Sequence, residues 1–269
     1  MAKETLLDLI RQAVSDIAQN GFSWDRVKGW QRRIEMALQT YRDTSQAERR
    51  IAHGLRELFA RKTTPTVLAK VHPGVDKVTL RMIAESHRGM LDDRIRASVD
   101  LIRLNRERAI SRMLDRFAGW STSIPSGGSS KQTPEIVSHI AKPLRSMSYE
   151  ERRLFIDQGH KLIANVNAVL AEQSNAIVVI WRSHYRQAGY DYREDHKERD
   201  GKYYAIRGNW AMERGFMKLG GHQYIDEITQ FGEEINCRCF GIYLSNLRDL
   251  PDDMLTLKGK AELNRVKVS

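Results

Sequence analysis

The chain has 269 residues, of which 41% are hydrophobic and 29% charged, and its formal net charge is +10. This composition is typical of a soluble globular protein and excludes a disordered chain. Because no run of 18 consecutive apolar residues occurs, we expect no membrane span. The N-terminal segment has apolar positions at helical spacing with acids between them, unlike a signal peptide, so we expect a protein that is made and folded in a cytoplasm.

The basic excess lies in the first half of the chain. Residues 1–123 contain 23 Lys and Arg against 15 Asp and Glu, whereas residues 124–269 contain 21 against 19. Such an asymmetry indicates a polyanionic partner, either a nucleic acid or an acidic protein face. The alternative is a solvated helical surface with surplus arginine.

The first sixty residues predict three helical segments. Apolar residues at helical spacing mark a first helix over Glu4–Gln19. Ser23 is a suitable cap for a second helix, which ends or bends near Thr44. A third segment follows, and the pattern breaks at Lys62–Pro65 and again at His72–Gly74.

A long basic helix, or two helices joined end to end, is predicted over Asp76–Gly119, a stretch with no proline and one internal glycine, Gly89. Its apolar residues keep a spacing of three to four, and acids at i,i+4 partly offset its basic side chains. We interpret these basic residues as candidate contacts to packaged DNA: Arg88, Arg94, Arg96, Arg103, Arg106, Arg108, Arg112 and Arg116.

The segment 121–133 is rich in serine and glycine and predicts a flexible linker. Thr133 and Pro134 then open a new helix, and Ser148 to Glu151 form a capping-box sequence that predicts a further helix start, ending near Gln173. The branched run Ala176–Trp181 predicts the central strand of a small domain.

The remaining strands are predicted at Lys202–Arg207 and Phe240–Leu244, with a short helix at Trp210–Gly215. The predicted fold is therefore mainly α, with an elongated helical N-terminal region and a small α+β C-terminal domain. Its predicted parts are a helical region with the long basic helix (1–120), the linker (121–133), an α+β domain (134–246) and a polar tail (247–269).

The densest unusual chemistry lies between Trp181 and Cys239. The two cysteines of the chain, Cys237 and Cys239, are one residue apart, and a disulfide across that spacing would be badly strained. Reduced thiols or metal ligands are therefore the two remaining options. His196 lies in a charged loop upstream, before the turn dipeptide Asp200-Gly201.

This order of residues resembles the phage Mu F-like minor head protein family, also called the phage head-morphogenesis domain. Phe231 stands where the family usually has proline. The resemblance covers roughly the last 120 residues. The matching positions are Trp181, Asp191, Arg193, His196, Asp200, Gly201, Gly232, Asn236, Cys237, Arg238 and Cys239.

The resemblance implies a minor head protein of a tailed bacteriophage that acts in head morphogenesis and DNA handling. It implies a structural protein without enzymatic turnover, present in few copies in the capsid interior near the portal and in the host cytoplasm during assembly. Its expected partners are the portal protein, other head proteins and phage DNA, with no membrane. The alternative is a phage-encoded DNA-binding nuclease or toxin-like effector.

The motif supports three interpretations of its chemistry. His196, Cys237 and Cys239 are suitable ligands for a structural zinc ion, with His222 or Asp195 as a candidate fourth ligand. A polar lock is the second interpretation. In that lock His196 and Arg193 pair with nearby acids (Asp191, Asp195 or Glu198) while the thiols pack as small hydrophobes. A histidine-metal nuclease site that uses Asp195, His196, Asp200 and Asn209 is the third.

Overall fold

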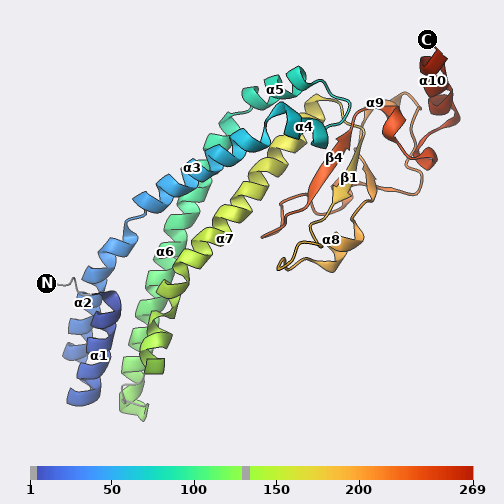
Figure 1. The fold of residues 1–269 in the computed structure, drawn as a ribbon. Coiled ribbons are helices and arrows are strands. Elements are labelled where there is room, and N and C mark those ends of the chain that lie inside the picture. The colour runs from blue at the N-terminus through green and yellow to red at the C-terminus, as the bar shows by residue number, and fades with distance from the viewer. Residues whose placement is uncertain (1–4, 129–133, 269) are drawn as a thin grey trace. The chain divides into compact units, whose positions relative to one another are not determined.

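The computed structural model describes residues 5–128 and 134–268. Long helices dominate the chain, and a small four-stranded sheet lies towards the C-terminus (Figure 1). The predicted fold class, mainly α with a small α+β part, is confirmed. No helix among the described residues combines the length and the apolar character needed to cross a bilayer.

The chain forms two compact units that are not continuous in sequence. Unit 1 comprises residues 1–52 and 97–154, and unit 2 comprises residues 53–96 and 155–269. Three helices continue from one unit into the other: α3 (Ser45–Lys62), α6 (Gly89–Ser123) and α7 (Pro134–Gln173). These boundaries fall inside helices, whereas the sequence analysis places its boundary at the serine- and glycine-rich segment. Residues 121–123 of that segment end α6, and residues 129–133 lie outside the described part of the chain.

Unit 1 is built from α1 (Leu6–Asn20), α2 (Trp24–Arg42) and parts of the three long helices. Thr5 and Asp8 form a capping box at the start of α1, and the Ser23 side chain accepts a hydrogen bond from the Arg26 N–H at the start of α2. The apolar faces of these helices meet in one core. Its fully buried members include Ile10, Ile17, Ile34, Leu38, Met113 and Phe117.

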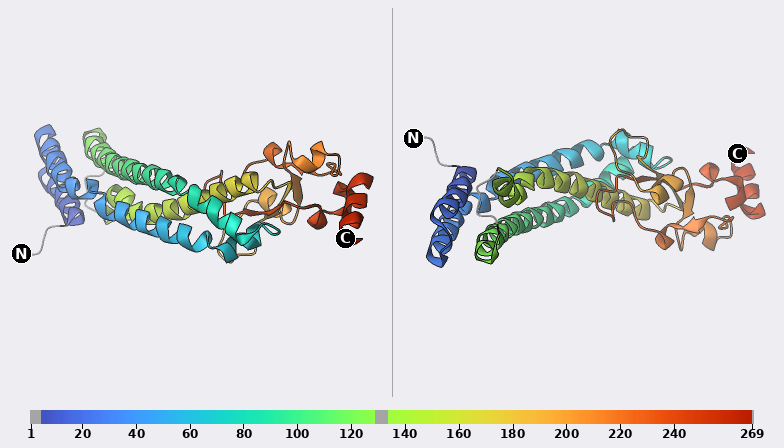
Figure 2. Two further views of the ribbon diagram at one scale, coloured as in Figure 1. Left: turned by 90° about the horizontal axis from the view of Figure 1, so that it is seen from above. Right: turned by 90° about the horizontal axis from the view of Figure 1, so that it is seen from below.

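Helix α7 is a single helix of 40 residues, so the predicted second start at Ser148 is wrong (Figure 2). Glu151, the acid of the capping-box sequence, instead pairs with Arg106 at 2.7 Å. Pro143 lies inside the helix and has no N–H to donate to the carbonyl of His139. The Arg116 guanidinium donates to that carbonyl at 2.7 Å, so a side chain from α6 replaces the missing backbone donor.

The helices of unit 2 include α4 (Pro65–Val71), α5 (Lys77–Ser86) and segments of α3, α6 and α7. The predicted long helix is two helices, because the chain leaves helical geometry between Ser86 and Gly89. His87 lies at this break, and its Nε2 is 3.2 Å from the Gln173 side-chain nitrogen on α7.

The sheet belongs to unit 2 and has the strand order β3-β2-β1-β4. Strand β1 is interior and pairs antiparallel with both neighbours, which confirms the predicted central strand. The short β3 runs parallel to β2. The strands are β1 (Val178–Arg182), β2 (Tyr203–Ala205), β3 (Gln223–Tyr224) and β4 (Phe240–Leu244).

Each face of the sheet contributes to a separate core. Val179, Trp181 and Tyr204 pack with the two cysteines and with the end of α7. Val178, Ile180 and Ala205 pack against the C-terminal segment. This alternation follows from the two-residue period of a strand.

The segment expected as a polar tail contributes to the second of these cores. Leu247, Leu250, Met254 and Leu255 are buried there, so the tail prediction is wrong for residues 247–255. Leu247 and Met254 lie on two short 3-10 turns, η3 (Leu247–Asp249) and η4 (Asp252–Met254), and Leu250 and Leu255 directly follow these turns. Such short turns give the apolar residues no α-helical period. A final helix, α10 (Leu257–Val268), follows.

Candidate metal centre

His196, Cys237 and Cys239 meet in the interior of unit 2. The His196 Nδ1 lies 3.5 Å from the Cys239 Sγ and 3.8 Å from the Cys237 Sγ. All three side chains are buried, and each offers one ligand atom within 4.8 Å of the others. Their sequence separation is bridged by the fold, because His196 lies on α8 (Glu194–Glu198) and the cysteines immediately precede β4.

The loop between β1 and β2 carries α8 and is closed by the predicted Asp200-Gly201 turn. The Asp200 carboxylate accepts a hydrogen bond from the Ser183 N–H at 2.8 Å, and the Gly201 N–H donates to the Trp181 carbonyl at 2.9 Å. Gly201 has a φ of 81°, a conformation that favours glycine. The turn therefore fixes the base of the loop from which His196 projects.

A second loop carries the cysteines and is held to α7. The Asn236 N–H donates to the Asp157 carboxylate on α7 at 2.7 Å. Asn236 itself has a φ of 63°, which reverses the chain just before Cys237. The Tyr190 hydroxyl bridges the Asn236 carbonyl and the Arg238 N–H, each at 3.2 Å. The asparagine and the tyrosine thus set the direction in which the two thiols point.

Trp181 packs against the residues of the site. It is fully buried and packs against Phe231 and His196, with ring centroids at 4.3 Å and 5.4 Å respectively. The Arg199 guanidinium lies 5.1 Å from its ring centroid. Phe231 therefore has a packing role here.

The second nitrogen of His196 faces a carboxylate. Its Nε2 lies 2.8 Å from the Glu234 Oε2, and the Arg193 Nε lies 3.2 Å from the same oxygen. Arg193 also donates to the Ile235 carbonyl at 3.2 Å. The two atoms are close enough for an ion pair but lack the geometry of a hydrogen bond. A ring proton on Nε2, the nitrogen that faces the carboxylate, would leave Nδ1 as a lone-pair donor towards the sulfurs. The sequence analysis missed Glu234, because an acid in the run Gly-Glu-Glu looks like ordinary surface charge.

The two thiols differ in acidity. A hydrogen bond from the Cys239 thiol lowers the pKa of Cys237 to about 6, and the same bond together with burial raises the pKa of Cys239. The Ser183 hydroxyl and the Trp181 indole oppose the rise at Cys239. Both of those donor atoms are buried without a partner oxygen or nitrogen in the described structure. The site therefore has two buried donor groups close to the Cys239 sulfur, which would stabilise a thiolate.

The donor set fits a soft divalent ion such as zinc. Two sulfurs and one imidazole nitrogen are typical zinc ligands, and a buried site suits a structural role. Within the described residues, the cluster contains three side chains of this kind. His222 pairs with Asp253 at 3.0 Å, and Asp195 pairs with Arg199 at 2.7 Å, so neither predicted fourth ligand belongs to the cluster.

The residues of the nuclease interpretation have other partners. Asp200 binds the Ser183 N–H, and Asn209 caps α9 (Trp210–Glu213) through the N–H groups of Ala211 and Met212. Asp191 is exposed in the loop between β1 and β2. Among the remaining matched residues, Gly232 packs against the Lys161 backbone on α7 with a φ of 73°.

The arginines predicted to contact DNA fall into two groups. One group has partners within its own unit: Arg94 with Gln158, Arg96 with Asp93, Arg103 with Glu48, Arg106 with Glu151 and Arg116 with the His139 carbonyl. The other group is exposed, and its side chains have no hydrogen bond or ion pair in the described part of the chain: Arg88, Arg108 and Arg112. The side chains of the second group could therefore bind phosphate without breaking a contact inside the protein.

Comparison of the chain with protein-family models, with curated proteins and with solved structures found no match.

Proposed function

We propose that the chain is a structural minor head protein of a tailed bacteriophage, which acts in head assembly and DNA handling. The supporting observation is that most residues carrying the resemblance lie in one packed region: Trp181 contacts His196, Asp200 and Gly201 close the loop, and Asn236 lies directly before the two cysteines. The chemistry of such a cluster is architectural, since its polar groups contact backbone and sulfur. The virion interior is the proposed location.

Assembly tests this proposal. During infection the protein is expected to co-purify with the portal protein, and mature particles are expected to contain it in far fewer copies than the coat protein. Quantitative mass spectrometry of purified particles measures both quantities. Copy numbers equal to the coat protein, or absence from particles, would contradict the proposal. Magnesium-dependent cleavage of DNA by the purified chain would favour the nuclease alternative instead.

We also propose that the cluster of His196, Cys237 and Cys239 binds zinc as a structural ion. Nδ1 of the histidine and the two sulfurs would hold it, and Glu234 would orient the imidazole through Nε2. The ion would tie α8 to the loop before β4. This role is an anchor for the fold rather than a reaction centre.

We propose that DNA contacts the exposed arginines of α6. Arg108 and Arg112 are four residues apart on one helix and are exposed without ion-pair partners in the described structure. Changing both to glutamate is expected to weaken binding to duplex DNA and to reduce the slope of log K against log salt by about 1.8, because two phosphate contacts are lost. Fluorescence anisotropy over a salt series measures the slope.

The matched control for this experiment changes Arg96 and Arg103 to glutamate. Both are exposed but already paired, with Asp93 and with Glu48 respectively, so their loss is expected to change the salt slope less. Equal effects of the two double variants, or no binding of the unmodified chain at low salt, would show that α6 does not bind phosphate.

A further inference from the structure

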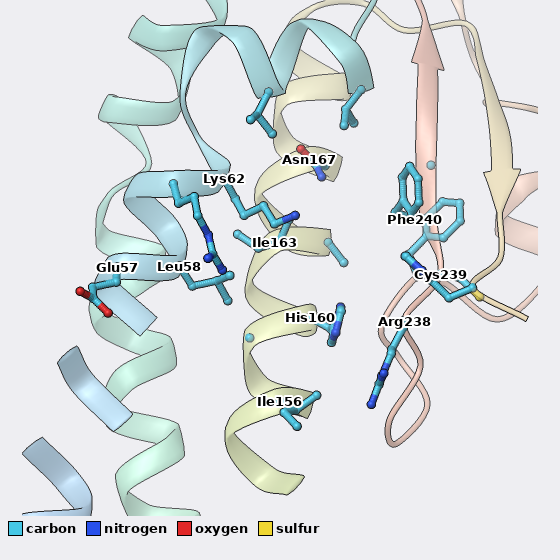
Figure 3. A pocket seen from close by; sticks show the side chains of 18 of the residues that line it. Glu57, Leu58, Lys62, Ile156, His160, Ile163, Asn167, Arg238, Cys239 and Phe240 are labelled. Carbon is cyan, nitrogen blue, oxygen red and sulfur yellow. The ribbon is translucent and has the colours of Figure 1, made fainter. Parts of the chain in front are cut away.

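Unit 2 contains a groove of about 940 Å³ between α3, α7 and strand β4. Its walls come from the second half of α3, from one face of α7, and from the segment that runs from Arg238 along β4 (Figure 3). Leu58, Ile156 and Ile163 supply much of the apolar lining, and Phe240 faces them from the strand. The groove is thus bounded on one side by the edge of a sheet.

Strand β4 is an edge strand, and its outward backbone groups have no partner. The backbone N–H and carbonyl of Trp181 on β1 form their hydrogen bonds on the side of β2. The residues before and after Trp181 on β1 therefore direct their N–H and carbonyl groups towards β4, and every second residue does the same. The register pairs those residues with Phe240, Ile242 and Leu244, which leaves the polar backbone groups of Gly241 and Tyr243 directed outward. In the described structure no backbone or side chain bonds to them, although both residues are buried and line the groove.

The rim of the groove is positively charged. Arg61, Lys62 and Arg238 line it, and Glu57 is the one acid among the described residues that do so. The Arg238 Nε is buried and has no hydrogen-bond partner in the described structure. Arg61 and Lys62 are exposed at the end of α3. An anionic group entering the groove would therefore meet cations that internal acids do not neutralise.

The pKa values of two histidines in the groove, His160 and His184, are affected by the same positive charges. Burial lowers the pKa of His160 to about 4, and the nearby charges of Arg238 and Lys62 contribute to that lowering. The pKa of His184 is lowered by burial and by the same two cations. His160 projects from α7 towards the side on which Arg238 lies (Figure 3). Both imidazoles are therefore neutral at pH 7, and they leave the arginine and lysine side chains to attract an anion.

We infer that this groove binds an extended, acidic segment of a partner protein, which adds as a strand to the free edge of β4. The outward groups of Gly241 and Tyr243 would bond to the backbone of the segment. Alternate side chains would reach the apolar wall of α7, and acidic side chains would meet Arg61, Lys62 and Arg238. Unpaired sheet edges accept strands in this way, and a groove supplies selectivity that an open edge lacks. The inference goes beyond the proposed function and requires neither the metal nor the assignment to a phage head.

A short synthetic peptide tests the inference on the full chain. The probe is a fluorescein-labelled, amidated peptide of seven residues in which valine and glutamate alternate. It is expected to bind, as measured by anisotropy at low salt, while the same peptide with lysine in place of glutamate binds at least tenfold more weakly. Two further probes carry N-methyl groups on the valines or on the glutamates. One of these two is expected to bind about tenfold more weakly than the other, because alternate N–H groups face opposite sides of a strand.

Charge-reversed variants locate the binding. The double change Arg61→Glu and Lys62→Glu is expected to reduce the affinity for the glutamate peptide more than tenfold. Lys218→Glu with Lys260→Glu is the matched control and is expected to leave the affinity unchanged, since both lysines are exposed and lie outside the groove. The inference is overturned by equal binding of the lysine peptide, by equal binding of both methylated probes, by an equal effect of the control, or by no binding. Displacement of the peptide by oligothymidine at lower concentration would identify the site as one for nucleic acid and would also overturn it.

Discussion

Replacement of both cysteines with serine is expected to remove bound zinc and to loosen unit 2, while the helices of unit 1 stay folded. Elemental analysis of the purified unmodified chain is expected to give about one zinc per molecule, and the double variant none. At free zinc a thousand times its dissociation constant, the ion contributes about 4 kcal/mol to the free energy of unfolding. Thermal denaturation with and without EDTA measures this contribution: EDTA is expected to lower the Tm of the unmodified chain only.

Alanine at both positions separates the metal from simple packing. If Cys237 and Cys239 act only as small buried hydrophobes, alanine is tolerated and EDTA has no effect on the unmodified chain. If they hold zinc, alanine causes the same loss as serine. Glu234→Gln is a milder variant, which keeps the ligands but removes the carboxylate at the histidine Nε2. It is expected to weaken zinc binding by about 10- to 100-fold with the fold intact. Unchanged affinity would show that Glu234 does not orient the imidazole.

Arg106→Ala is expected to destabilise unit 1 by about 3–5 kcal/mol, because it strands a nearly buried carboxylate. The guanidinium pairs with Glu151 at 2.7 Å, and the two side chains are only 12% and 13% exposed. It also donates to the Tyr41 carbonyl at 3.3 Å and to the Asp43 carbonyl, so it holds the turn between α2 and α3. Urea denaturation followed by circular dichroism measures the change in the free energy of unfolding.

Two further variants make the Arg106 result specific. Arg108→Ala removes an exposed arginine from the same helix and is expected to change stability by less than about 0.5 kcal/mol. Adding Glu151→Leu to Arg106→Met replaces the pair with apolar side chains of similar length and is expected to recover most of the loss. A loss as small for Arg106→Ala as for Arg108→Ala would mean that the pair contributes little.

The sequence identified residues of the site better than it showed how those residues are arranged. The spacing of Cys237 and Cys239 and the isolated position of His196 in a charged loop suggested a shared site as one of three interpretations, and the structure places the three side chains together. Glu234 could not be recognised in the same way, because its proximity to the histidine depends on how the fold brings the loop before β4 against α8. The proposed fourth ligands failed for a similar reason: His222 was chosen by residue type, and the fold pairs it with Asp253.

Local sequence patterns predicted where the helices and strands lie better than they predicted where each of them begins and ends. Branched residues at 176–181 marked the central strand, and the predicted Phe240–Leu244 strand matches β4. The capping-box sequence at Ser148 indicated a boundary that does not exist, because Glu151 is held by Arg106, which lies 45 positions away in the chain. The same contact engages the guanidinium of Arg106, one of the residues predicted to contact DNA. The sequence pattern of one helix cannot show that one of its charged side chains pairs with a residue on another helix.

Three helices pass between the two compact units without an intervening loop, and this limits how the gene can be rearranged. Each unit is made from two separate stretches of sequence, so neither can be produced by trimming one end. A recombination event that exchanged only the C-terminal half would leave residues 53–96 behind, and with them α4 and α5. The chain should therefore be inherited whole, and its variation between relatives should accumulate by substitution rather than by the exchange of modules.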